Sequence, residues 1–299
     1  GAIAPLCTLV RDGADPVKEQ AAAALWSLSH DNAPNKATML KLGGIEPLVT
    51  LLVTGTTEYS LEQASGALAS MCKKHNENRD AIAKLISAKL SSKDTMAKTP
   101  AGGVRLLQAV AKMCEGSGGN QAAIARAGGV PSLIMWLSGA FESHGTEKSV
   151  VAEAQAAAAH ALLSMVTNNE PLQALIARSN GIPPLIELLS VDNAATQAGA
   201  ARLLWHLAGS QESGAAITAA GGIAPLVGML LAETVNLQEL AATVISRLMQ
   251  SNKQVANAPE TQEAIEPLVK LLSTGSAVGQ QQAACALATL AVVPLNRGL

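Results

Sequence analysis

Hydrophobic residues recur along this chain at the spacing of a helix face. A leucine is followed three and four places later by further apolar residues, as in Leu48, Leu51 and Leu52. This spacing puts the apolar side chains on one side of a short helix. Further along, a second apolar pair three residues apart, such as Leu25 and Leu28, marks a longer helix. The pattern predicts an all-α chain made of repeated groups of helices.

A short sequence motif marks each group of helices. Gly43-Gly44-Ile45-Glu46-Pro47-Leu48 recurs with variations, and the closing leucines are Leu6, Leu48, Leu133, Leu185, Leu226 and Leu268. These leucines are 42, 85, 52, 41 and 42 residues apart, and because 85 is about two periods, a degenerate copy is expected near Leu90. Proline fits the first turn of a helix, and Gly-Gly lets the preceding helix end in a sharp bend. The sequence therefore predicts seven units in one solenoid, at about residues 1–31, 32–74, 75–116, 117–168, 169–209, 210–250 and 251–293.

The segment before each Gly-Gly predicts one more short helix, as in residues 78–83, where Asn78 is the expected cap. A short helix, a glycine hinge, a second helix and a longer third helix resemble the armadillo (ARM) repeat of beta-catenin and importin-alpha. HEAT repeats have two helices without this hinge and come second. The resemblance covers essentially the whole chain. It implies a right-handed α-solenoid superhelix whose third helices line a concave groove.

Two units depart from the pattern. In the third unit, polar residues follow Leu90 and Lys89 replaces the proline. Gly102 and Gly103 weaken its third helix, so a frayed or distorted unit is expected. This unit is either a hinge or a product of sequence drift that its neighbours hold in place. The fourth has about ten extra residues, 138–148, between its second and third helices. Phe141 and His144 in this loop are candidate partner contacts, and a tolerated insertion is the alternative. The abrupt ends suggest a fragment of a longer protein.

Charge and composition narrow the class of protein. Lys plus Arg is 21 and Asp plus Glu is 23, giving a net charge of −2, and aromatic residues are only 2%. This balance argues against a strongly basic nucleic-acid binder, and nucleic-acid binding is not expected. The four cysteines are far apart in sequence and no signal peptide is visible, which predicts free thiols in a reducing compartment. A cytoplasmic location is expected, with the nucleus left open.

Residues 214–232 contain no charged side chain, which is long enough to suggest a membrane span. Glycines, Pro225 and the repeat register divide this run into two short helices, so no span is expected. No phosphate-binding loop, zinc-protease motif or nucleophile elbow occurs, and the histidines are scattered. We therefore expect no enzyme, cofactor, metal or small-molecule substrate.

Candidate binding residues follow from the resemblance. On each third helix, importin-alpha has an asparagine that binds the backbone of an extended peptide, and a tryptophan one turn earlier. The matching asparagine positions here hold none; they are Ser27, Ser70, Lys112, Ser164, His206, Arg247 and Thr289. The matching tryptophan positions, His160 and Arg202 among them, hold no tryptophan. The importin-type peptide clamp is therefore not carried over.

The remaining groove residues are partly basic. Lys112, Arg202 and Arg247, with His160 and His206 between them, would favour acidic or phosphorylated extended segments. Ordinary solvated polar positions are the alternative. Trp26 and Trp205 share one repeat position, where they wall the groove or pack between units. We expect a non-catalytic protein–protein interaction scaffold or adaptor, the alternatives being a nuclear transport receptor of importin-alpha type or the substrate-binding part of a ubiquitin ligase.

Overall fold

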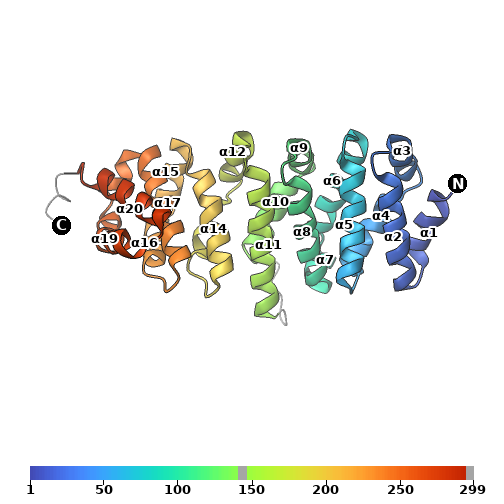
Figure 1. Cartoon of the computed structure of the whole chain (residues 1–299), viewed down its shortest axis with the longest axis horizontal. Coiled ribbons are helices and arrows are strands. Elements are labelled where there is room, and N and C mark those ends of the chain that lie inside the picture. The colour runs from blue at the N-terminus through green and yellow to red at the C-terminus, as the bar shows by residue number, and fades with distance from the viewer. Residues whose placement is uncertain (141–146, 294–299) are drawn as a thin grey trace. The chain divides into compact units, whose positions relative to one another are not determined.

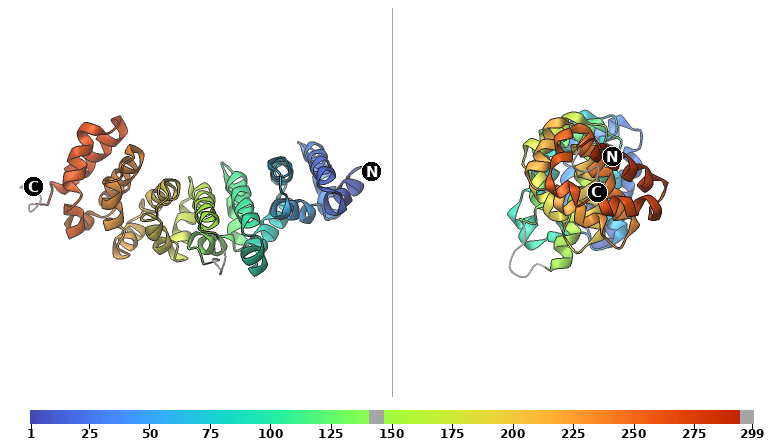
Figure 2. Two further views of the ribbon diagram at one scale, coloured as in Figure 1. Left: turned by 90° about the horizontal axis from the view of Figure 1, so that it is seen from below. Right: turned by 90° about the vertical axis from the view of Figure 1, so that its left-hand side faces the viewer.

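The computed structural model describes residues 1–140 and 147–293, and every regular element in these residues is a helix. The chain forms two compact units, Gly1–Met165 and Val166–Leu299. Within the first, the long helices α2, α5 and α8 lie side by side; within the second, α14, α17 and α20 do so (Figure 1). The shorter helices pack beside them, and Figure 2 shows the same elements from two further directions. The all-helical fold class is confirmed for the described residues.

Two short helices followed by a longer one form the recurring module. In the first unit the helices are α1 Ile3–Asp12, α2 Asp15–Ser29, α3 Ala33–Lys41, α4 Ile45–Thr54, α5 Glu58–Cys72, α6 Asn76–Leu90, α7 Lys93–Lys98, α8 Pro100–Cys114, α9 Gly118–Arg126, α10 Gly129–Leu137 and α11 Lys148–Val166. The helices of the second are α12 Glu170–Arg178, α13 Ile182–Leu188, α14 Ala194–Leu207, α15 Gln211–Ala219, α16 Ile223–Leu230, α17 Val235–Ser251, the 3₁₀ helix η1 Lys253–Asn257, α18 Pro259–Gln262, α19 Ile265–Thr274 and α20 Ala277–Leu290.

Glycines make the bend between the two short helices. Gly43, Gly128 and Gly221 have φ angles of 67°, 77° and 77°, a region that other residues seldom enter. In the module of α12 and α13, Asn180 takes this role with a φ of 61°. Asparagine tolerates the left-handed region better than most side chains. Four of the predicted hinges therefore have this left-handed residue, and in one of them it is asparagine.

The core of each unit lies between its long and short helices. The anchor leucines Leu48, Leu133 and Leu185 are completely buried, as are Leu68 and Leu204 on third helices. Burial of such side chains contributes roughly 1.5–3 kcal/mol each. The apolar spacing in the sequence thus corresponds to the observed core.

The first short helix of a module is tied to the preceding third helix by side-chain amides. Asn35 Nδ2 donates to the Leu28 carbonyl at 2.8 Å, Asn78 Nδ2 to Met71 at 3.3 Å, and Asn120 Nδ2 to Met113 at 2.5 Å. Each amide bonds a carbonyl seven residues earlier, at the end of a helix. The expectation that Asn78 caps α6 is wrong, because His75 is the cap and Asn78 lies inside the first turn.

The third predicted unit lacks the hinge. Helix α6 continues to Leu90, which therefore ends a helix and does not begin one, and the six-residue α7 follows. The third unit is therefore distorted, as expected, but the distortion does not lie at Gly102 and Gly103, since α8 is continuous and both glycines are buried. A Cβ at Gly103 would collide with the ring of Trp136, and one at Gly102 would lie 2.6 Å from the Val53 carbonyl. These glycines permit close packing against α8.

One helix in the described residues, Lys148–Val166, is long and apolar enough to cross a membrane by length and composition alone. Two bent pairs pass the same test only if each is counted as one span, and one of them is Gln211–Ala219 with Ile223–Leu230, bent by 82°. The charge-free run at 214–232 is therefore two helices, as the repeat register predicts.

Candidate binding surface on the third helices

Five predicted groove residues lie on third helices of the first unit. Ser27, Lys112 and His160 are exposed on α2, α8 and α11, whereas Ser70 on α5 and Ser164 on α11 are half-buried. The Ser70 hydroxyl accepts a hydrogen bond from Ser29 Oγ at 2.8 Å, which joins α2 to α5. Ser70 therefore has an internal structural contact.

A hollow of about 450 Å³ surrounds Lys112 between α5 and α8. Glu58, Glu62 and Arg105 also line it. Arg105 donates to the carbonyls of Val53, at 3.0 Å, and Gly55, and so binds the end of α4. The charges around Lys112 are therefore of both signs, and its surroundings are not simply basic.

The structure brings together three of the predicted residues in the second unit. Trp205 and His206 on α14 and Arg247 on α17 line one pocket, whereas Arg202 is exposed on α14 outside it. Thr289 on α20 donates from Oγ1 to the Cys285 carbonyl at 3.1 Å within its own helix. The candidate site of the second unit is therefore centred on Trp205, His206 and Arg247.

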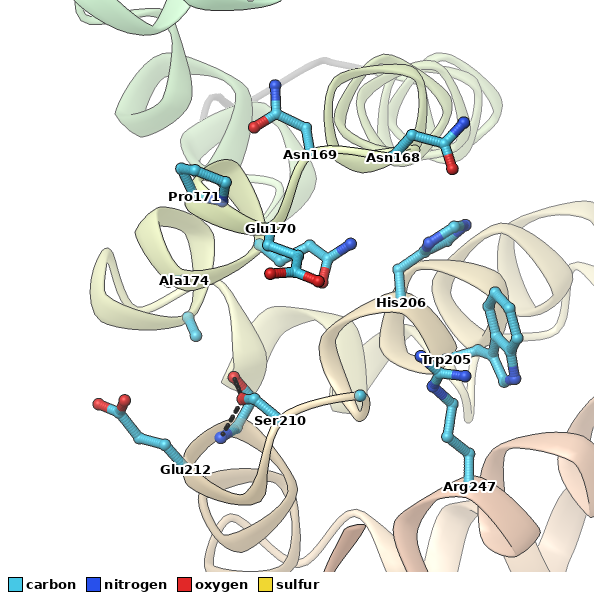
Figure 3. Close-up of a pocket in the computed structure, with 14 residues that line it drawn as sticks. Asn168, Asn169, Glu170, Pro171, Ala174, Trp205, His206, Ser210, Glu212 and Arg247 are labelled. Atoms are coloured by element: carbon cyan, nitrogen blue, oxygen red, sulfur yellow. Dashed lines mark hydrogen bonds between the residues drawn. The ribbon is translucent and has the colours of Figure 1, made fainter. Parts of the chain in front are cut away.

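This pocket, here called the Trp205 pocket, has a volume of about 960 Å³ (Figure 3). It lies between the beginnings of α12 and α15, the end of α14 and the Arg247 side chain. Its lining consists of Asn168, Asn169, Glu170, Pro171, Gln173, Ala174, Ala177, Trp205, His206, Gly209, Ser210, Glu212, Ser213 and Arg247. Most of the lining side chains are polar, so the pocket suits a polar ligand or an extended main chain.

Arg247 is held against Trp205. The guanidinium carbon lies 4.3 Å from the centre of the indole, a cation–π geometry, and the ring of His206 meets the indole edge-on at 4.9 Å. Arg247 Nε is buried and has no hydrogen-bond acceptor among the described residues. Trp205 is half-buried. It lines the pocket and also packs against Arg247 of the next third helix, α17.

Gly209 gives the guanidinium its space. A Cβ on Gly209 would lie 2.6 Å from Arg247 Nη2, closer than two such atoms can approach. Gly209 follows the end of α14, so the turn into α15 is shaped around the arginine. Any larger residue at this position would displace the guanidinium.

His206 does not add a positive charge near neutral pH. Burial lowers its pKa below the ordinary value of 6.5, and the positive charge of Arg247 lowers it further. The imidazole is therefore mainly neutral at pH 7. Arg247 is then the one permanently positive side chain among the described residues that line the pocket.

Two carboxylates lie in the same lining. Glu170 begins α12, and its carboxylate points into the pocket (Figure 3). Glu212, in the first turn of α15, forms an ion pair with Arg178 at 3.6 Å between Oε2 and Nη2. The Trp205 pocket therefore presents charges of both signs.

The pocket residues that sequence reasoning missed lie on the turns before α12 and α15. Asn169 and Ser210 are the helix caps there, accepting from the backbone N–H groups of Leu172 at 3.3 Å and Ser213 at 3.1 Å. Capping residues at these places do mark the starts of helices in the sequence. Nothing in the spacing shows that two successive turns and a side chain from the next third helix enclose one pocket.

Trp26 occupies the same repeat position as Trp205. Trp26 packs on α5, where a Cβ at Gly66 would lie 2.7 Å from its ring. Phe141 and His144 lie outside the described residues. Among the residues that are described, no group of three or more histidine, cysteine, aspartate or glutamate side chains is placed to hold a metal ion.

Comparison with known proteins identifies the repeat. Residues 168–209, which contain α12 to α14, match the Armadillo/beta-catenin-like repeat family. Similar solved structures include an engineered protein, with a TM-score of 0.58 at 21% identity over 96% of this chain and 98% of that one. The designed armadillo repeat protein YIII(Dq)4CqI has a TM-score of 0.57 at 17% identity over 96% and 99%.

Another designed armadillo repeat protein, described in complex with the peptide (KR)4, has a TM-score of 0.55 at 17% identity over 96% of this chain and 99% of its own. A search of curated proteins gives no significant match. At these identities the likeness to the solved structures concerns the fold.

Proposed function

We propose that this chain is a non-catalytic scaffold that binds extended segments of other proteins along its third helices, because residues 168–209 match the armadillo repeat and the fold is similar to that of designed armadillo repeat proteins. A designed protein of the same fold is described in complex with a peptide. The proposal extends that mode of binding to this chain.

The observation that carries the proposal is the Trp205 pocket. It is open, mostly polar, and bounded by two third helices, and the Arg247 guanidinium is stacked on Trp205 within it. Because Nε is buried, the Nη groups are the donors left for a ligand. A bound segment would supply acceptors for these donors.

We further propose that the preferred segments are acidic or phosphorylated. Lys112 and Arg202 are exposed on third helices, and Arg247 faces the Trp205 pocket. Charge-assisted hydrogen bonds from arginine to carboxylate or phosphate are roughly twice as strong as neutral ones. The (KR)4 peptide of the designed protein has the opposite charge, so this proposal rests on the side chains of the present chain.

Fluorescence anisotropy with two labelled probes tests the proposal. The probes are a ten-residue peptide of alternating aspartate and glutamate and a ten-residue peptide of alternating lysine and arginine. We expect the acidic probe to bind more tightly, and the double variant Arg202→Glu plus Arg247→Glu to lose about tenfold or more in affinity and to depend less on salt.

The matched control is the double variant Arg11→Glu plus Arg126→Glu. Both arginines are exposed and lie on the short helices α1 and α9, and the change in net charge is the same. We expect a loss of less than about threefold, from long-range charge alone. Equal binding of the acidic probe to the wild type and the Arg202/Arg247 variant would contradict an acidic partner, and binding of neither probe would contradict the scaffold.

A further inference from the structure

The Trp205 pocket distinguishes between two kinds of anion. We propose that it binds a single carboxylate side chain of an extended partner segment on the Arg247 guanidinium and discriminates against a phosphorylated residue. The inference rests on the proposed function, because it assumes that a segment occupies this surface, and it narrows the class of partner.

The first step is how Arg247 is presented. Its guanidinium is stacked at 4.3 Å over Trp205 and its Nε is buried, which leaves the Nη groups as the donors available to a ligand. Arginine binds a carboxylate through parallel N–H groups in a fixed plane. An arginine whose plane is already fixed loses little side-chain freedom on binding. Trp205 therefore acts as a support for an anion site.

The second step is the space around those donors. Gly209 leaves room for Nη2, which a Cβ would approach to 2.6 Å. Ser210 Oγ donates to Ser213 Oγ at 3.0 Å, and the Ser210 oxygen also accepts from the Ser213 backbone N–H. The Ser210 hydroxyl is thus engaged at the start of α15. The donors for an anion come chiefly from Arg247.

The third step is the count of charges. A phosphoserine carries about −1.5 to −2 at neutral pH and is usually held by several cations. The lining offers one arginine, a mainly neutral His206, and the carboxylates Glu170 and Glu212, of which Glu212 is already paired with Arg178. A second negative charge on the ligand would face Glu170, and the described lining residues offer no second cation to it. One carboxylate matches this arrangement and a phosphate does not.

Titration by NMR tests the inference on the whole chain. The probes are three blocked ten-residue peptides of glycine, serine and alanine that differ only at one central residue, which is glutamate, glutamine or phosphoserine. The indole N–H signal of Trp205, assigned with Trp205→Phe, reports occupancy of the pocket. We expect the glutamate probe to bind about fivefold or more tightly than either other probe.

Matched variants separate the pocket from general charge. Arg247→Ala and Arg11→Ala remove the same charge, but Arg11 is exposed on the short helix α1 and only Arg247 lines the pocket. We expect Arg247→Ala to weaken the glutamate probe about tenfold or more and Arg11→Ala to weaken it less than about twofold. Gly209→Ala keeps every charge but displaces the guanidinium, so we expect it to weaken the glutamate probe as much as Arg247→Ala does. This variant still tests the site if Arg247→Ala fails to fold.

The source of the carboxylate is tested with sodium acetate. We expect acetate to compete only at about a hundredfold higher concentration than the glutamate probe, because the probe also contributes main-chain contacts. If acetate competed at the same concentration as the glutamate probe, the ligand would be a free carboxylate and not a peptide segment. The proposed site would be wrong if the phosphoserine probe bound as tightly as the glutamate probe or more tightly. It would also be wrong if the two arginine variants had equal effects, or if the Trp205 signal did not change. Continued binding of the acidic anisotropy probe in those cases would leave the scaffold function standing.

Discussion

At the scale of single residues, Arg247 and His206 share one small region, and each changes what the other does. The positive charge of Arg247 opposes protonation of His206, in addition to the larger effect of burial. A histidine whose pKa is lowered by folding binds fewer protons in the native state than in the unfolded state. Its contribution to stability is therefore present above pH 6.5 and is lost as the pH falls below it.

This coupling gives a first prediction. Replacing Arg247 by alanine removes the nearby cation and admits water, so the pKa of His206 should rise toward its ordinary value. The imidazole Hε1 signal of His206, followed by NMR from pH 4.5 to 8.5, measures it. Arg202→Ala should leave the titration unchanged, since Arg202 lies outside the pocket. An identical curve for Arg247→Ala would mean that burial alone sets the pKa.

Asn78 provides a second prediction. Its side chain is completely buried, and its Nδ2 donates to the carbonyls of Lys36 at 3.2 Å and Met71 at 3.3 Å. Asn78→Ala should lower the free energy of unfolding by about 1–3 kcal/mol, because the carbonyls lose a donor. Asn78→Asp should lower the free energy of unfolding further, because the carboxylate would place an acceptor oxygen against both carbonyl oxygens. Urea unfolding followed by circular dichroism measures both.

The control is Asn76→Ala in the same turn. Asn76 is exposed, and its Oδ1 accepts from Arg79 Nη1 at 2.8 Å, so its loss should stay within about 0.5 kcal/mol. If Asn78→Asp were as stable as the wild type, the amide would not be donating to these carbonyls.

The sequence identifies Arg247, Trp205 and His206 as candidates because repeat spacing puts them on third helices. It does not identify Glu170 or Gly209, whose importance depends on contacts between modules. Neither does it show that the Ser70 and Thr289 hydroxyls bond within the protein. Such partners are set by distances across the packed helices, which repeat position alone does not encode.

At the scale of helices, the sequence predicts most modules because apolar spacing, proline and Gly-Gly all agree. The third unit fails for a local reason. Residues 83–90 contain no glycine or proline, so nothing ends α6 before Leu90 and the hinge is lost. The helix propensity of glycine also misleads at α8, because close packing against Val53 and Trp136 outweighs a cost of about 1 kcal/mol per residue.

That competition gives a third prediction, in which the same substitution has opposite effects on two helices. Gly103→Ala should lower the free energy of unfolding by about 1–3 kcal/mol, since its methyl group would overlap the Trp136 ring. Gly228→Ala in α16 should raise it by up to about 1 kcal/mol, because no described residue beyond its own turn of helix lies within 4 Å of the added Cβ. Urea unfolding of the two variants compares them directly. Stabilisation by both would mean that α8 moves away from Trp136 at little cost.

At the scale of the whole molecule, the burial of a residue depends on which modules flank it. The position after the anchor leucine is at most 9% exposed at Cys7, Val49, Ile134, Ile186 and Val227, but 52% exposed at Val269. At the third position after the anchor leucine, Leu9 is 42% exposed, whereas Leu51 and Trp136 are at most 4% exposed. Since each module contacts only its neighbours, equivalent side chains have unequal energetic weight.

The final prediction follows from this inequality. Val227→Lys places an ammonium group in the packed interior of the second unit and should lower the free energy of unfolding by about 3 kcal/mol or more. Val269→Lys, at the equivalent position of the next module, should change it by less than about 0.5 kcal/mol, because the side chain already faces solvent. Urea unfolding measures both, and sedimentation velocity checks for association. A large loss for Val269→Lys would show that another protein surface covers α19 in solution, and a dimer that dissociates in this variant would identify that surface as a second copy.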